Sequence, residues 1–181
     1  EPVAIMFTNS YHYGGKLIDI SEKNIEVMRC LESIKHKFLM NYPEMNVTTN
    51  NFDIDLETIF SNKDLNKEIL FEKTYFNDPM YILYSSGTTG KPKCIIHNTG
   101  GPLIQHMKEQ QLHCDLKKND KIFYFTTCGW MMWNWLTTAL SSNASILLYD
   151  GSPFFPEKDS LFKIAEEEKL DIFGVSAKYI D

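Results

Sequence analysis

This sequence of 181 residues has fewer positively charged than negatively charged side chains. It has 18 Lys and Arg against 24 Asp and Glu, which gives a net charge of -6. This balance does not favour a nucleic acid or an anionic membrane as a partner, and we expect neither. Disorder is excluded as well, because 43% of the residues are hydrophobic and 13% are aromatic, enough for the core of one ordinary domain.

The sequence also lacks long apolar runs. Residues 122–149 carry no charge, but Thr, Asn and Ser interrupt them, whereas a membrane-spanning helix needs roughly 20 predominantly apolar residues. We interpret this stretch as a buried strand, a helix and a second strand. The chain opens on Glu1 and an apolar run without a signal peptide, so we expect a part excised from a longer protein.

The cysteines lack the spacing of a metal site. Cys30, Cys94, Cys114 and Cys128 contain no Cys-x-x-Cys pair, so a structural zinc site is not predicted and we expect no metal ligand here. An even number of cysteines permits disulfides, but a chain with a sizeable core does not need them. We interpret the cysteines as free thiols in a reducing compartment, which predicts a cytosolic, cytoplasmic protein.

Strands and helices alternate along the chain. Short apolar runs predict strands at residues 3–7, 37–40, 81–84, 94–97, 121–125, 145–149 and 171–176. Apolar residues near helical spacing predict helices at residues 21–34, 98–113, 131–140 and 159–169. We expect Ser21 to cap the first of these helices, and Asp159 or Ser160 the last. The remaining segments predict a turn at 11–15, a loop at 41–51, and a short helix with a linker at 52–74. The alternation predicts an α/β fold, with helices layered on a mainly parallel sheet.

The clearest chemical signal is a loop between two predicted strands, Ser85-Ser86-Gly87-Thr88-Thr89-Gly90-Lys91-Pro92-Lys93. Its two glycines leave backbone N–H groups accessible to an anion. Four hydroxyl groups add donors and two lysines add positive charge, which together suit a polyphosphate. It is not a Walker A loop, because Pro92 rather than Ser or Thr follows Lys91. The alternative is a flexible hairpin tip, but such tips rarely end in Lys-Pro-Lys.

The segment from Tyr84 to Lys93 resembles the signature of the adenylate-forming superfamily, which includes acyl-CoA synthetases, luciferases and peptide-synthetase adenylation domains. The resemblance implies a large N-terminal AMP-binding domain and a reaction in two steps. A carboxylate attacks the α-phosphate of ATP, giving an acyl-adenylate and pyrophosphate. The thiolate of CoA then displaces AMP to give a thioester.

Further segments resemble one branch of that superfamily, the acetoacetate–CoA ligases. They are residues 77–84, 96–101, 127–135, 148–153 and 173–178, and the match is strongest over residues 76–181. This resemblance implies ATP, acetoacetate and CoA as small-molecule substrates, with Mg2+ as a cofactor. Two alternatives stay open: another short-chain acyl-CoA synthetase, for acetate or propionate, and a non-catalytic nucleotide-binding module.

The resemblance implies roles for two groups of residues. The β- and γ-phosphates of ATP would be held by Ser85, Ser86, Gly87, Thr88, Thr89, Gly90 and Lys93. The acyl substrate would be bordered by Gly129, Trp130, Met131, Met132, Ser176 and Ala177. Ordinary core packing is the alternative for Met131 and Met132. We interpret Trp133 and Trp135 as core residues and His97 as a structural histidine.

Several superfamily motifs are not found within residues 1–181. They are the motif that contacts adenine and magnesium, the ribose-binding Asp, and the adenylation lysine of the C-terminal lid domain. We therefore expect residues 1–181 to be a part of the N-terminal AMP-binding domain without the lid domain, with a possible subdomain boundary near residues 61–76. We expect no catalytic residue in this piece, and no formation of acyl-CoA by the piece alone.

Overall fold

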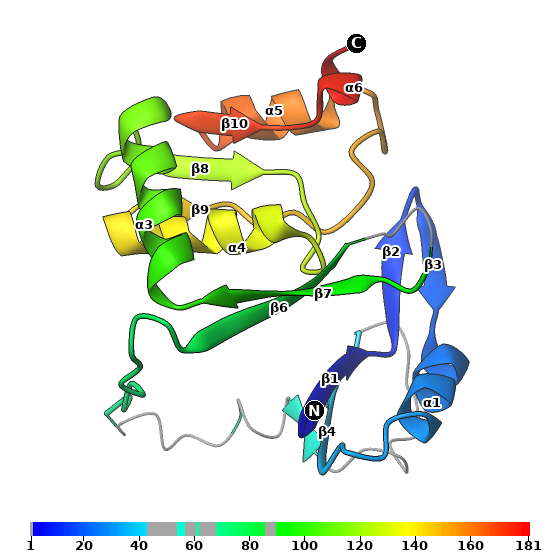
Figure 1. The fold of residues 1–181 in the computed structure, drawn as a ribbon. Helices are drawn as coiled ribbons and strands as arrows, with labels where there is room; N and C mark the ends of the chain where they lie inside the picture. Colours follow the sequence, from blue (N-terminus) through cyan, green and yellow to red (C-terminus); the bar gives the residue numbers. More distant parts are fainter. Residues whose placement is uncertain (1, 43–53, 57–60, 62–67, 86–89) are drawn as a thin grey trace. The chain divides into compact units, whose positions relative to one another are not determined.

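The computed structural model describes residues 2–42, 54–56, 61, 68–85 and 90–181 (Figure 1). The chain divides into two compact units. The first comprises Glu1–Leu70 with Phe154–Pro156, and the second comprises Phe71–Pro153 with Glu157–Asp181. Each unit combines helices with a small parallel sheet and an antiparallel hairpin, which confirms the predicted α/β fold.

The first unit is built on a three-stranded parallel sheet in the order β1-β4-β5. Its strands are β1 (Ala4–Thr8), β4 (His36–Met40) and β5 (Ile54–Asp55). Between β1 and β4 the chain forms the hairpin β2 (Ser10–Tyr13) and β3 (Lys16–Asp19), followed by helix α1 (Ser21–Arg29). Leu39 of β4 is buried to 1% exposure, and buried Asn9 accepts a hydrogen bond of 2.7 Å from the backbone N–H of Tyr42.

The structure corrects four predictions in this unit. The turn predicted at 11–15 is confined to Gly14 and Gly15, whose positive φ values suit glycine, because the residues before them pair as β2. Residues 54–55 form a strand, not part of the helix and linker predicted at 52–74, most of which lies outside the described residues. The other two corrections concern α1.

Helix α1 ends at Arg29, five residues before its predicted end. The backbone N–H groups of Lys35 and His36 both donate to the carbonyl of Val3, which draws the chain into β4. Ser21 makes no capping bond. Asp19 instead accepts a hydrogen bond of 2.8 Å from the backbone N–H of Ser21.

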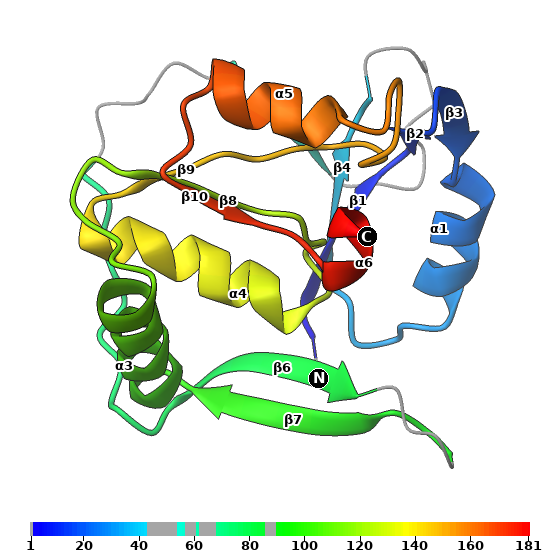
Figure 2. The same cartoon turned by 90° about the horizontal axis from the view of Figure 1, so that it is seen from above.

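The second unit contains the parallel sheet β10-β8-β9, with β8 at its centre. Its strands are β8 (Lys121–Tyr124), β9 (Ser145–Ile146) and β10 (Ile172–Gly174). The helices α4 (Met131–Thr138) and α5 (Ser160–Glu167) cover opposite faces of this sheet (Figure 2). The strand predicted at 145–149 is shorter than expected, because only its first two residues pair with β8.

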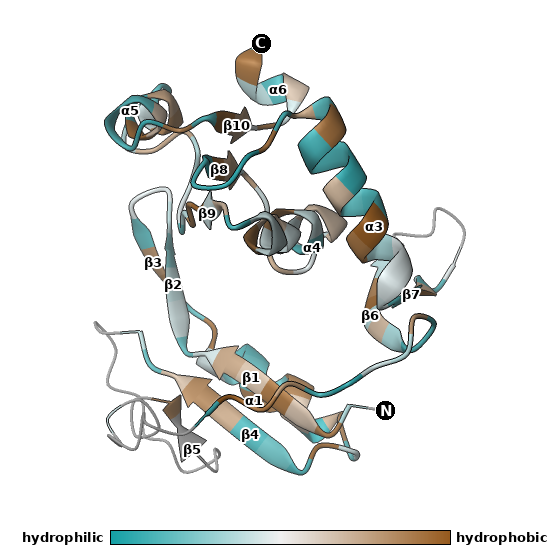
Figure 3. Cartoon of the chain, turned by 90° about the vertical axis from the view of Figure 1, so that its left-hand side faces the viewer, coloured by the Kyte–Doolittle hydropathy of each residue, from teal (hydrophilic) through white to brown (hydrophobic). Residues whose placement is uncertain are grey.

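Alternating side chains of β8 explain the two covered faces. Ile122 belongs to a buried cluster with Trp135, Leu136 and Ala139, and the ring of Tyr124 meets that of Trp135 edge-on. Phe123 points the other way and stacks on Phe173 of β10. In Figure 3, β8 and β10 accordingly appear mostly hydrophobic.

The second unit also contains the hairpin predicted on either side of the Ser85–Lys93 segment. Strand β6 (Pro79–Ser85) pairs antiparallel with β7 (Lys93–Asn98). Helix α3 (Gly100–Lys108) follows and continues as a π-helical turn, η1 (Glu109–His113), in agreement with the helix predicted at 98–113. Two short elements complete the unit, the 3-10 turn η2 (Ala139–Ser142) and helix α6 (Ala177–Ile180).

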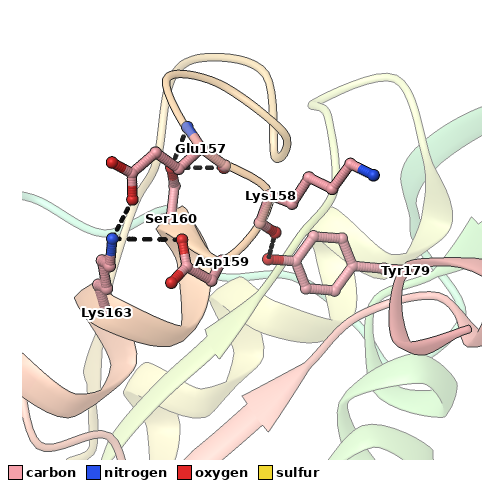
Figure 4. Close-up of polar contacts among 6 residues, drawn as sticks. All are labelled: Glu157, Lys158, Asp159, Ser160, Lys163 and Tyr179. Carbon is pink, nitrogen blue, oxygen red and sulfur yellow. Dashed lines mark hydrogen bonds and ion pairs between the residues drawn. The ribbon is translucent and has the colours of Figure 1, made fainter.

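The start of α5 differs from the prediction, although the helix itself is confirmed. Neither Asp159 nor Ser160 makes a side-chain cap to the helix. The hydroxyl of Ser160 bonds back to both backbone groups of Glu157, while Lys163 pairs with Glu157 and Asp159 (Figure 4). A turn therefore precedes the helix, and its hydrogen bonds use the Ser160 hydroxyl that was expected to cap the helix.

All four cysteines are free thiols, as the sequence predicted, and the structure places each of them in an exposed position. Within the described part of the chain, no helix combines the length and the apolar character that a bilayer crossing requires.

Candidate functional site

The residues predicted to bind phosphate begin at the end of strand β6 and finish at the start of strand β7. Ser85, the last residue of β6, lies opposite Lys93, the first residue of β7. Ser85 is half-buried, whereas Gly90, Lys91 and Lys93 are exposed, so both ammonium groups are accessible to an anion. Four residues predicted to bind phosphate lie outside the described residues, namely Ser86, Gly87, Thr88 and Thr89.

The base of this hairpin is tied to helix α3. The backbone N–H of Thr99 donates to the carbonyl of Asp78 at 2.8 Å, and that of Gly100 to the carbonyl of Phe76 at 2.9 Å. A Cβ on Gly100 would fall 2.1 Å from the ring of Phe76, which explains the glycine there. The side chain of Asn98 accepts a hydrogen bond of 2.8 Å from Gly101, so it caps the start of the helix.

The segment predicted to border the acyl substrate opens helix α4, and its residues separate into different environments. Gly129 and Trp130 lie in the turn before the helix and are exposed. Met131 is 43% exposed and lines a cavity. Met132 is half-buried and packs on the core cluster of Trp135 and Leu136, because successive residues of a helix point in directions about 100° apart.

That cavity lies among β7, α3 and the start of α4, and its volume is about 380 Å³. Its wall combines polar and apolar side chains, which are His97, Pro102, Gln105, His106, Glu109 and Met131. Only Met131 was predicted from the sequence as a substrate contact. His97 does line the cavity, while its buried Nδ1 has no hydrogen-bond partner among the described residues.

His106 is held in one tautomer on the cavity wall. Its Nδ1 lies 2.9 Å from Oγ1 of Thr138, and that hydroxyl donates its single hydrogen to the carbonyl of Asn134 at 2.8 Å. Thr138 can therefore only accept from His106, so Nδ1 carries the ring hydrogen. Burial is the main cause that lowers the pKa of His106; Glu109 opposes the shift and His97 adds to it. The neutral ring is thus favoured.

Glu109 organises the rest of this wall. Its Oε1 accepts a hydrogen bond of 2.6 Å from Nε2 of Gln105, one helical turn earlier. Its Oε2 accepts one of 3.1 Å from Nε1 of Trp135, whose ring belongs to the core. The carboxylate is therefore fixed between the cavity and the core. In the sequence, Gln105 and Glu109 are visible only as polar residues of an amphipathic helix, and that pattern does not indicate a binding site.

Ser176 and Ala177 do not line this cavity. Ser176 has extended backbone angles just before α6, and Ala177 is the first residue of that helix; both are exposed. The helix is attached to the segment before α5 by Tyr179, whose hydroxyl donates to the carbonyl of Lys158 at 3.2 Å (Figure 4). The described residues contain no cluster of three or more His, Cys, Asp or Glu that could hold a metal ion.

The Ser85–Lys93 segment, followed along the chain by the strands of a parallel sheet, is the arrangement expected of an adenylate-forming enzyme. The profile of the AMP-binding enzyme family matches residues 15–180. The chain belongs to this family.

Within the family, the chain is similar to acetoacetyl-CoA synthetases. It is 57% identical to the Rhizobium meliloti (strain 1021) enzyme over 113 residues, which cover 62% of this chain and 17% of that protein. It is 39% identical to the Gallus gallus enzyme over 186 aligned positions, covering 99% of this chain and 28% of that protein. The solved structure of acetoacetyl-CoA synthetase from Streptomyces lividans matches 99% of this chain and 27% of its own, with a TM-score of 0.91 and 38% identity. The chain thus spans about a quarter of these last two relatives.

Proposed function

We propose that this chain is part of an ATP-dependent acid–thiol ligase that converts acetoacetate to acetoacetyl-CoA. The reaction would form an acyl-adenylate with release of pyrophosphate, and then the thioester with release of AMP. The observation that carries the proposal is the similarity of almost the whole chain to acetoacetyl-CoA synthetases. We further propose that residues 1–181 belong to the large N-terminal AMP-binding domain, with a subdomain boundary near residues 61–76, of a cytosolic enzyme.

The β6–β7 hairpin would bind the phosphates of ATP. The residues assigned to this role are Ser85, Ser86, Gly87, Thr88, Thr89, Gly90 and Lys93. Support comes from the exposed ammonium group of Lys93 opposite Ser85, since charge-assisted bonds to phosphate are the stronger ones. ATP supplies the adenylyl group that activates the carboxylate, with pyrophosphate as the leaving group, while the hairpin holds its polyphosphate.

The acyl group would be bordered by the start of α4, through Gly129, Trp130, Met131 and Met132, and by Ser176 and Ala177. Met131 has the best support, because it lines the cavity of about 380 Å³. Mg2+ would accompany ATP, as it commonly accompanies substrate phosphates, and we assign it no ligand in this chain. CoA is the second substrate of the ligase, and we assign no residue to it either.

The test is a substrate survey on the full-length protein. We expect pyrophosphate exchange into ATP to depend on acetoacetate, and acetoacetyl-CoA and AMP to form when CoA is added. Acetate, propionate and butyrate are the comparison substrates. A higher kcat/KM for acetate or propionate would contradict the assignment of acetoacetate. ATP binding without exchange in the presence of any of these acids would indicate a non-catalytic nucleotide-binding module.

A further inference from the structure

The cavity beside Met131 has a polar wall, and the proposed reaction assigns no role to it. The polar residues of this wall are His97, Gln105, His106 and Glu109. The lining residues of the cavity include one carboxylate, that of Glu109, and no Lys or Arg. A negative wall of this kind disfavours a second carboxylate. A short keto acid would therefore enter with its carboxylate directed away from Glu109 and its neutral end towards this wall.

The wall presents a positioned hydrogen-bond donor. A carboxylate can only accept, so the amide of Gln105 must turn its NH2 group towards Glu109, as the 2.6 Å contact between Nε2 and Oε1 requires. The bond from the buried ring of Trp135 fixes Glu109 in turn. One N–H of Gln105 is used in this contact, and the other has no acceptor within the described part of the chain.

The two histidines on the wall are less suited to this task. The Nδ1–H of His106 is already donated to Thr138, which leaves its Nε2 as an acceptor. The Nδ1 of His97 is buried and inaccessible to a ligand. Gln105 is exposed and carries an unused donor on a side chain whose orientation Glu109 determines.

We propose that Gln105 is a specificity-determining residue of the ligase: its second N–H donates to the oxygen on carbon 3 of a 3-keto acid, and Glu109 is the positioning residue that orients it. This inference rests on the proposed function and on the placement of the acyl group beside Met131. Butyrate is the informative comparison, because it has the same number of carbon atoms as acetoacetate and lacks only this oxygen. Loss of one neutral hydrogen bond corresponds to a change of up to about tenfold in relative kcat/KM.

The experiment compares kcat/KM for acetoacetate and butyrate in the full-length protein. Gln105→Met keeps the length of the side chain and removes the donor. We expect the ratio of acetoacetate to butyrate to fall about three- to tenfold, through a loss on acetoacetate alone. Glu109→Met removes the acceptor that orients Gln105, and we expect a smaller fall in the same ratio. If either residue had a purely structural role, its substitution would lower kcat/KM equally for acetoacetate and for butyrate.

The matched control is Gln111→Met. Gln111 lies in the same helical segment, is exposed, and bonds to the hydroxyl of Ser142 at 3.0 Å without lining the cavity. For Gln111→Met we expect the ratio of kcat/KM for acetoacetate to that for butyrate to equal the ratio of the unmodified protein. An unchanged ratio in Gln105→Met, in a protein that does make acetoacetyl-CoA, would overturn the role of Gln105 alone. If the unmodified protein makes no acyl-CoA from acetoacetate, the proposed function fails first and this inference fails with it.

Discussion

Gly174 of β10 lies directly against the ring of Tyr124 on the neighbouring strand β8. A Cβ placed on Gly174 would fall 2.3 Å from Cδ2 of that ring, far inside van der Waals contact. The ring cannot easily move away, because it meets Trp135 edge-on with their centroids 6.0 Å apart. The glycine therefore allows an aromatic pair between the sheet and α4.

This contact predicts that Gly174→Ala destabilises the protein. We expect a loss of about 1–3 kcal/mol in the free energy of unfolding, the usual cost of overpacking a well-packed site. Gly129→Ala is the control, since a Cβ there would meet nothing within 4 Å. The double variant Gly174→Ala with Tyr124→Ala should lose less than the sum of the two single variants. Strict additivity in denaturant unfolding would contradict the steric explanation.

Removal of the charge at Lys93 is expected to weaken binding of ATP and pyrophosphate. Lys93 is exposed at the start of β7, and a charge-assisted bond to phosphate is worth roughly 10- to 100-fold in affinity. We therefore expect Lys93→Ala to raise the apparent Kd for ATP by about this factor, with a smaller effect for Lys91→Ala. Isothermal titration of the full-length protein measures both. Equal affinities of Lys93→Ala and the unmodified protein would remove Lys93 from the phosphate site.

The two methionines of α4 should respond differently to a change of size. Met131 lines the cavity, so we expect Met131→Ala and Met131→Phe to change the preference between acetate and acetoacetate. Met132 packs on the core cluster, so Met132→Ala should in addition destabilise the fold, by about 2–3 kcal/mol. Measured kcat/KM ratios and thermal unfolding separate the two effects. A constant preference ratio across sizes at both positions would refute an acyl pocket here.

Acid pH should destabilise the protein partly through His106. Its folded-state pKa lies below its ordinary value of 6.5, chiefly because of burial, so the unfolded chain binds more protons in the window between the two values. The stability from this group is complete above pH 6.5 and is lost as the pH falls through that window. The charged or titratable neighbours that influence it are Glu109 and His97.

The variant His106→Gln should therefore show a weaker decline of its thermal unfolding midpoint below pH 6.5 than the unmodified protein. Glutamine can still donate to Thr138, so the comparison concerns the slope against pH and not the absolute midpoint. His113→Gln, an exposed change in η1, serves as the control and should leave the slope unaltered. Parallel profiles for all three proteins would argue against titration of His106.

The sequence alone was sufficient to predict several elements whose apolar pattern and turn residues are local. The hairpin around the Ser85–Lys93 loop, the helix after Asn98 and the strand at β8 follow from local apolar patterns and turn residues. Local rules were wrong where a competing partner intervenes, whether it lies nearby, as Glu157 does for Ser160, or far away in sequence. Helix α1 ends early because Val3, remote in sequence, accepts hydrogen bonds from Lys35 and His36.

The polar wall of the cavity was decided only by tertiary structure. His106 meets Thr138 from a position 32 residues away, and Glu109 meets Trp135 across 26 residues. No spacing rule connects such pairs, because their contact depends on how α3 and α4 pack together. The same packing directs Met132 to the core and Met131 to the cavity, a distinction between adjacent residues of one type that sequence pattern alone does not contain.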